Sequence, residues 1–215
     1  MTAADQRTGR RRQGRPPGTS ARAMELIALR LFTEQGFDQT TVEQIAEEAG
    51  VSRRTFHRYF DSKAHVLWYE FDDEVARLRT AFEDVPQDVP LMEAIRRVVV
   101  GVNTYSAEDV AELRIRMHLI GSVPALQASA APHYDAWERT VGDFAAERLG
   151  RPADSLFPLA ISRATLAACR AAFDRWVAEA EKDLTTYLDL ALWALGNGFA
   201  VDSGGARPDA VPDSR

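Results

Sequence analysis

Residues 40–63 read "TTVEQIAEEAGVSRRTFHRYFDSK", and this stretch decides the fold of the first part of the chain. Gly50 predicts the end of one short helix, and Ser52 is a good N-cap for the next. Arg53 and Arg54 then occupy the first turn of that second helix, where the helix dipole disfavours an exposed cation by about 0.3–1 kcal/mol. Such a break with a local rule often marks a functional site.

A helical wheel separates the second short helix into a polar side and a packing side. The polar side consists of Arg53, His57, Arg54 and Arg58. The packing side consists of Thr55, Tyr59, Phe56 and Phe60. The first helix carries an apolar seam, and Thr40 with Glu43 has the spacing of a capping box at its start. Two short helices joined at a glycine, with one exposed polar face, indicate a helix-turn-helix.

Further helical patterns extend outward from this stretch along most of the chain. They cover residues 20–35, 61–83, 91–105, 107–121, 124–149, 155–181 and 184–199. No sustained period-two pattern indicates a strand. We therefore predict an all-α fold of about nine helices.

Four segments follow from these patterns. Residues 20–66 form the predicted helix-turn-helix DNA-binding domain, and residues 67–199 form a second helical body. Residues 1–19 lack apolar periodicity and predict a disordered basic arm, while residues 200–215 read as a disordered tail. The arm "GRRRQGRPPG" is consistent with insertion into a DNA minor groove, and equally with a solubilising tail.

Charge is distributed unevenly along the chain. The net charge is −6, yet residues 1–65 hold 11 Lys and Arg against 8 Asp and Glu, while residues 66–215 hold 15 against 24. A local basic region of this kind fits DNA, because arginine bonds bidentately to guanine and cations meet phosphates. A face of arginines is more often merely solvated, but its combination with a glycine turn and capped short helices favours DNA. Phosphate contacts are predicted where hydroxyls and an amine open helices, at Thr40, Thr41, Ser52 and Lys63.

Residues 24–68 closely resemble the N-terminal domain of TetR-family transcriptional regulators, and the contiguous run "LFTEQGFDQTTVEQIAEEAGVSRRTFHRYFDSK" carries the resemblance. The resemblance implies base contacts from Arg53, Arg54, Thr55, His57 and Arg58. It implies phosphate contacts from Thr41, Ser52, Tyr59 and Lys63. His57 departs from the family, which commonly has tyrosine there, and Arg54 stands where glycine or alanine is frequent. The operator is therefore expected to differ from those of familiar relatives.

The same resemblance implies an effector pocket in the helical body. Its candidate lining residues are Tyr105, Arg114, Met117, His118, His133, Tyr134 and Trp137. The segments "SRRTFHRYFDSK", "WYEFD" and "DVPLMEAIRR" are also similar to TetR regulators associated with mycofactocin gene clusters, which respond to acyl-CoA. A small lipophilic effector, such as acyl-CoA, is thus expected. Arg114 and Arg116 interrupt an apolar segment, where they would meet an anionic ligand or simply face solvent.

The last two predicted helices are long and apolar, which indicates a homodimer built as a four-helix bundle. The candidate interface residues are Leu166, Phe173, Trp176, Leu188, Leu192 and Trp193. Two-fold symmetry of this kind matches a palindromic double-stranded operator. The expected protein is a ligand-responsive repressor.

An enzyme and a protein-binding adaptor are the two alternative function classes for this sequence. For an enzyme, the four histidines show no metal-ligand spacing, and there is no phosphate loop or nucleophile elbow, so no catalytic residue, metal or cofactor is expected. The single cysteine, Cys169, reads as a packing residue. A helical adaptor that binds only proteins is the other alternative. No apolar run reaches about 18 residues, so no membrane span is expected, and the cytoplasm is the expected location.

Overall fold

The computed structural model describes residues 20–179 and 181–199, and in these residues the chain forms ten α-helices, one 3-10 helix and no strand. The helices are α1 (Ala21–Gln35), α2 (Val42–Glu48), α3 (Arg53–Phe56), η1 (His65–Trp68, the 3-10 helix), α4 (Phe71–Glu83), α5 (Leu91–Val102), α6 (Ala107–Ser122), α7 (Pro124–Ser129), α8 (Ala131–Leu149), α9 (Leu156–Glu179) and α10 (Leu184–Gly196). The predicted all-α fold is confirmed, with ten α-helices where about nine were expected. The predicted arm at 1–19 and tail at 200–215 lie outside the described residues.

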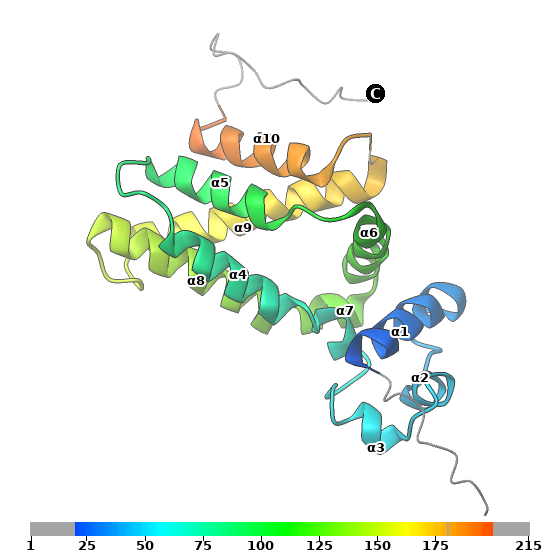
Figure 1. Ribbon diagram of the computed structural model, residues 1–215. Helices are drawn as coiled ribbons and strands as arrows, with labels where there is room; N and C mark the ends of the chain where they lie inside the picture. Colours follow the sequence, from blue (N-terminus) through cyan, green and yellow to red (C-terminus); the bar gives the residue numbers. More distant parts are fainter. Residues whose placement is uncertain (1–19, 180, 200–215) are drawn as a thin grey trace, which may run out of the picture.

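The helices form a small lobe and a larger body (Figure 1). Helices α1, α2 and α3 make the small lobe, and α4, α5, α8, α9 and α10 pack side by side in the body. Helix α6 connects the two, because it contacts α1 on one side and α9 on the other. The 3-10 helix η1 also contacts α1. Helices α6 and η1 are therefore the elements through which the body contacts α1.

Local side-chain and glycine signals set the helix ends in the small lobe. The Ser20 hydroxyl accepts a hydrogen bond from the backbone N–H of Ala23 at 3.1 Å and starts α1. Gly50 has φ +66°, a left-handed conformation that costs a side-chain-bearing residue about 1–2 kcal/mol and that permits the tight turn between α2 and α3. Ser52 caps α3 by accepting from the N–H of Thr55 at 3.1 Å.

Two predicted helices are interrupted. The single helix expected over 61–83 is instead a turn, η1 and then α4, with bends at Asp61 and Ser62. The helix expected over 124–149 divides at Ala130 into α7 and α8. Pro132 explains this second break, because proline lacks the N–H that a helix interior needs and is tolerated in the first turn, where it lies in α8.

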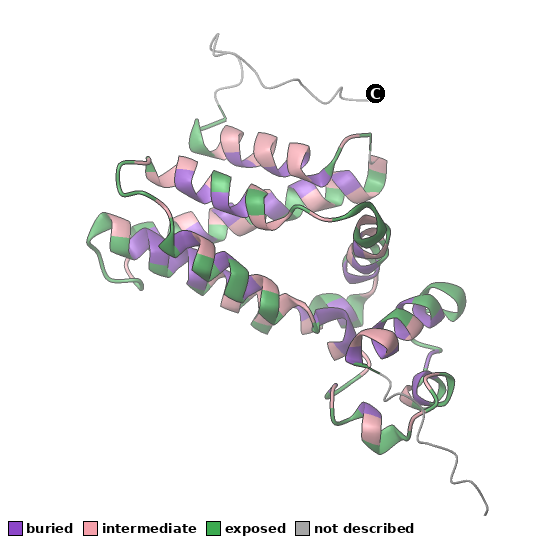
Figure 2. Cartoon of the chain, in the orientation of Figure 1, coloured by how far each residue is buried: buried purple, intermediate pink, exposed green. Residues whose placement is uncertain are grey.

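The chain has two apolar cores, and buried faces point inward in both (Figure 2). The first core joins the small lobe to α6 and α7, because Leu119, Ile120 and Leu126 pack with Phe32 and Phe56. The second core fills the body around Trp176. The expected division after residue 66 therefore stays a prediction, since the core of the small lobe includes residues of the body.

Helix α9 is the only described helix that is long and apolar enough to cross a bilayer by length and composition, with a mean hydropathy of 1.3. It packs against α8, α10 and α6 as a helix of the body. Its most apolar window is only 33% buried in the protomer, however, so much apolar surface on α9 has no cover within one chain.

Candidate functional site

The polar side of α3 faces solvent, as the wheel predicts. Arg53, Arg54, His57 and Arg58 are exposed, whereas Phe56 and Phe60 are buried. These two phenylalanine rings lie 5.2 Å apart between centroids and anchor the segment to the first core. The α-helix ends at Phe56, and residues 57–59 continue as turns, so the exposed face spans α3 and the turn that follows it. Because Phe56 and Phe60 pack into the first core, the opposite side, which carries the three arginines and His57, faces solvent.

Three of the exposed polar side chains contact neighbouring residues of the same lobe. The guanidinium of Arg53 pairs with the carboxylate of Glu43 on α2 at 3.0 Å. The Arg58 guanidinium donates to the hydroxyl of Tyr59 at 3.0 Å and lies over its ring at 4.8 Å. The His57 Nδ1 lies 3.3 Å from the carbonyl oxygen of Phe60. Arg53, His57 and Arg58 therefore each have a contact within the lobe.

The hydroxyl groups predicted to meet phosphate have different environments. Thr41, not Thr40, caps α2, and it forms a capping box with Gln44 in place of the expected Thr40–Glu43 pair. Thr40 is fully buried and its hydroxyl donates to the carbonyl oxygen of Gly36 at 2.9 Å, so it has no surface for a phosphate contact. Thr41 and Ser52 are exposed at the starts of α2 and α3. The predicted register was one residue out because both threonines satisfy the same local rule.

Lys63 is engaged within the lobe. Its ammonium donates to the carbonyl oxygens of Phe37 at 2.6 Å, Thr40 at 2.9 Å and Asp38 at 3.3 Å. It also lies 4.4 Å from the centroid of the Phe37 ring. An ammonium has three N–H donors, and all three are used here. Lys63 therefore ties the turn between α1 and α2 to the segment after α3.

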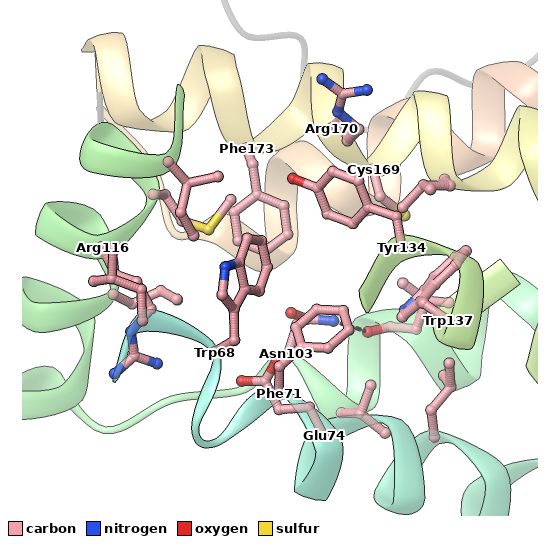
Figure 3. A pocket seen from close by; sticks show the side chains of 18 of the residues that line it. Trp68, Phe71, Glu74, Asn103, Arg116, Tyr134, Trp137, Cys169, Arg170 and Phe173 are labelled. Atoms are coloured by element: carbon pink, nitrogen blue, oxygen red, sulfur yellow. Dashed lines mark hydrogen bonds between the residues drawn. The ribbon is translucent and has the colours of Figure 1, made fainter. Parts of the chain in front are cut away.

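A cavity of about 90 Å³ lies in the body where η1, α4, α5, α6, α8 and α9 meet. Its wall is mostly apolar and aromatic, and Figure 3 shows Trp68 between Arg116 on one side and Tyr134 with Arg170 on the other. Arg170 is exposed and its guanidinium lies over the Tyr134 ring at 5.2 Å. This pair marks the end of the cavity next to solvent.

Polar groups gather at another part of the cavity wall. The hydroxyl of Tyr105 donates to the carboxylate of Glu74 at 3.0 Å, close to Asn103. Burial raises the pKa of Glu74, and the hydrogen bond from Tyr105 opposes the rise. Burial raises the pKa of the Cys169 thiol to about 12, so this cavity residue stays protonated and is a poor nucleophile.

A buried ionic cluster joins the cavity wall to the small lobe. Arg116 on α6 lines the cavity, and its guanidinium bonds to Glu25 on α1 and, at 3.4 Å, to Glu70. Glu25 is fully buried and also pairs with Arg22 at 2.9 Å. Burial raises the pKa of the Glu25 carboxyl, and the Arg116 guanidinium opposes that rise. The cluster thus connects α1, α6 and the start of α4.

Comparison with known proteins identifies the family. Residues 27–67 match the sequence pattern of the tetR family of bacterial regulatory proteins, and residues 89–200 match that of the MftR C-terminal domain. The chain belongs to the TetR family. The resemblance expected from the run around α2 and α3 is therefore confirmed, and it extends through the body.

Relatives of similar length support the same conclusion. The protein assigned as the mycofactocin biosynthesis transcriptional regulator MftR of Mycobacterium tuberculosis is 29% identical over 195 residues, which cover 91% of this chain and 96% of the relative. The transcriptional regulator TcmR of Streptomyces glaucescens is 31% identical over 195 residues, covering 87% and 83%. The expected similarity to mycofactocin-associated regulators is confirmed, and both relatives are named as transcriptional regulators rather than enzymes.

A solved structure shows the same fold. FadR of Thermus thermophilus, a TetR-family transcriptional repressor in complex with lauroyl-CoA, superposes with a TM-score of 0.56 at 22% identity, covering 88% of this chain and 100% of that one. In the described part of the TetR-family chain, no group of three or more His, Cys, Asp or Glu side chains is arranged to hold a metal ion.

Four of the seven residues predicted to line an effector pocket lie in the wall of this cavity. Tyr105, Met117, Tyr134 and Trp137 line it. Three predicted residues do not, and the pocket assignment is corrected for them. Arg114 lies over the ring of Trp176 at 4.9 Å, His118 faces solvent, and His133 stacks on the outer side of Trp68 with centroids 4.5 Å apart.

Several lining residues were missed as pocket residues. They are Trp68, Phe71, Glu74, Leu166, Cys169, Arg170 and Phe173, together with Arg116, whose ligand role had been left open. A signal for four of them exists, because 166, 169, 170 and 173 follow the i, i+3, i+4, i+7 spacing of a single helix face. Arg116 follows the same rule on α6 with Leu113, Met117 and Ile120.

The candidate dimer interface also needs correction. Trp176, Leu188 and Leu192 are buried within the protomer and leave no side-chain surface for a second chain. Leu166 and Phe173 face the cavity, while Trp193 is half-buried on α10. The exposed apolar residues of α9 are Leu156, Phe157 and Leu159. A helix that is apolar on all sides hides which side packs inward, and this explains the error.

Proposed function

We propose that this TetR-family regulator is a homodimeric repressor that acts in the cytoplasm on a palindromic DNA operator and leaves it when a small lipophilic effector enters the cavity. Each protomer places the exposed face of α3 in a major groove, with Arg53, Arg54, Thr55, His57 and Arg58 toward the bases. Thr41, Ser52 and Tyr59 meet the phosphates. The exposure of three arginines and His57, on a segment anchored by buried Phe56 and Phe60, carries this proposal.

The size of the cavity supports control by a ligand. Pockets for small molecules typically measure about 300–1,000 Å³, and this one measures about 90 Å³. A ligand therefore enters only if the walls move apart. Since η1 and α6 form part of the wall and both contact α1, that movement shifts the DNA-binding lobe.

The lining favours an effector with an apolar chain. Most of the wall is aliphatic or aromatic, including Leu67, Val99 and Phe173, and the exposed Arg170 stands near its edge. A fatty acyl compound such as an acyl-CoA, with its apolar chain inside the cavity, fits this lining. The complex of the related fold with lauroyl-CoA gives a precedent for that class of ligand.

The apolar surface of α9 supports the homodimer. Leu156 is 75% exposed and Phe157 is 53% exposed, which is unfavourable in a chain that stays single. Half-buried Trp193 lies on the neighbouring α10. A second copy of α9 and α10 would cover these side chains and create the two-fold axis that a palindrome requires.

DNA binding to the region upstream of its own coding sequence tests the proposal. Binding should be sequence-specific, should weaken with salt by a factor set by the number of phosphate contacts, and should be reversed by dodecanoyl-CoA. Binding that does not distinguish this region from random DNA would defeat the proposal. An absence of any salt-dependent DNA binding would favour the alternative of a helical adaptor that binds only proteins.

A further inference from the structure

Arg116 has an unusual position for an arginine. Its side chain is only 9% exposed, and it belongs to the wall of the cavity and to the ionic cluster at the same time (Figure 3). The two terminal nitrogens of its guanidinium bond to Glu25 and Glu70. One rigid planar group thus borders the cavity and bonds to α1 of the small lobe.

A guanidinium has five N–H donors, and the one on Nε of Arg116 is unused. The Nε–H of Arg116 is buried and has no hydrogen-bond partner among the described residues. Buried N–H groups are nearly always paired, so an orphaned one calls for an explanation, and a ligand that is absent supplies one.

We infer that Arg116 is the effector-sensing residue of this cavity, whose Nε–H donates to a carbonyl or carboxylate oxygen of an otherwise apolar effector. This inference rests on the proposed function and adds to it both the chemical group that is recognised and the connection to DNA. An effector oxygen that draws the Nε–H towards itself moves the whole rigid guanidinium, and with it the terminal nitrogen that bonds to Glu25. The tie between α6 and α1 then loosens, and the DNA-binding lobe is released.

The acidic side chains near Arg116 offer an alternative, which is recognition of a cationic ligand instead of an acceptor oxygen. Glu74 lines the cavity and Glu70 lies next to Arg116, so a ligand amine would find carboxylates here. An acceptor oxygen bonds to Arg116, whereas an ammonium bonds to the glutamates. Two ligands with the same chain and opposite head groups therefore separate the two chemistries.

Decanoate and decylamine are suitable probes, used below their micelle concentrations. Their binding can be followed by the fluorescence of Trp68 and Trp137, which line the cavity. We expect the wild-type protein to bind decanoate at least about tenfold more tightly than decylamine, as a charge-assisted hydrogen bond predicts. The double variant Arg116→Met with Glu25→Gln should reduce the preference to below about threefold.

The double variant is chosen so that the protein still folds. Arg116→Met alone would leave the buried Glu25 carboxylate without its main partner, which is strongly destabilising. Glu25→Gln removes that charge, and the pair leaves the net charge of the chain unchanged. Arg114→Met is the matched control, since Arg114 is on the same helix but outside the lining of this cavity. It should keep the tenfold preference.

A second measurement tests the connection to DNA. Glu25→Gln alone keeps Arg116 and should keep the preference for decanoate. It should lower the effect of decanoate on DNA affinity from at least about fivefold to below about twofold. Equal binding of the two probes to the wild type, no binding of decanoate, or an unchanged preference in the double variant would each overturn the inference. Absence of DNA binding by the wild type would instead defeat the proposed function. The two results are separable, because the preference between the probes is measured by fluorescence in the absence of DNA.

Discussion

Replacement of Lys63 by methionine separates a structural role from a DNA contact. Methionine keeps most of the apolar stem but removes the ammonium that bonds to the carbonyl oxygens of Phe37, Thr40 and Asp38. The two shorter bonds are charge-assisted but only partly buried, so we assign each about 1 kcal/mol. The contact with the Phe37 ring adds about 0.5 kcal/mol. The expected loss of unfolding free energy is about 2.5 kcal/mol.

Thermal unfolding measures this loss. For a chain of this size, about 2.5 kcal/mol lowers the Tm by about 5–10 °C. DNA affinity should fall alike for all sequences, and the dependence of log K on log salt should change by less than the ~0.9 expected for one lost phosphate contact. The control Arg58→Met should behave oppositely, because Arg58 is exposed: its Tm should stay constant and its DNA binding should weaken. An unchanged Tm for Lys63→Met would refute the structural role.

Four further outcomes are expected. Arg53→Ala should cost about 1–3 kcal/mol of discrimination at one base pair, measured by competition between operator variants. Phe157→Glu should shift the dimer towards monomer in sedimentation, because it places a charge on the exposed apolar face of α9. Burial raises the pKa of Glu25, so the fold holds this proton where the unfolded chain has lost it, and stability falls as pH rises through that interval; in thermal melts from pH 4 to 7, Glu25→Gln should gain relative to wild type as pH rises. Burial lowers the pKa of His133, so the fold favours its neutral form, and His133→Gln should reduce the loss of stability below about pH 6.5.

The features that could be predicted from sequence are those that short-range rules determine. Ser20, Gly50 and Ser52 mark helix ends because caps and positive φ angles act within a few residues. The exposed side of α3 follows from the helical period alone. The same rules left Thr40 and Thr41 equivalent as caps, and only the burial of Thr40 against the end of α1 distinguishes them.

The features that were missed depend on contacts between distant parts of the chain. Glu25 and Arg116 are 91 residues apart, and neither neighbourhood indicates that the other will bury beside it. Trp176 and Phe157 both lie on α9, and both are apolar, yet one is buried and the other exposed. Periodicity shows that such a helix packs, but which residues enter the protomer core is decided by the helices that pack against α9, namely α6, α8 and α10.

The small volume of the closed cavity also determines the concentration at which an effector is detected. A ligand that binds only an enlarged form has an apparent Kd equal to its intrinsic Kd divided by the fraction of enlarged molecules. If that fraction is about 1%, a value typical of minor states, the dose of effector needed rises about a hundredfold. The size of wall side chains such as Trp68 and Phe71 then influences the fraction of enlarged molecules, and so the effector concentration to which the protein responds. The threshold of the response can change through their size, while the groups that recognise the effector and the groups that read DNA stay the same.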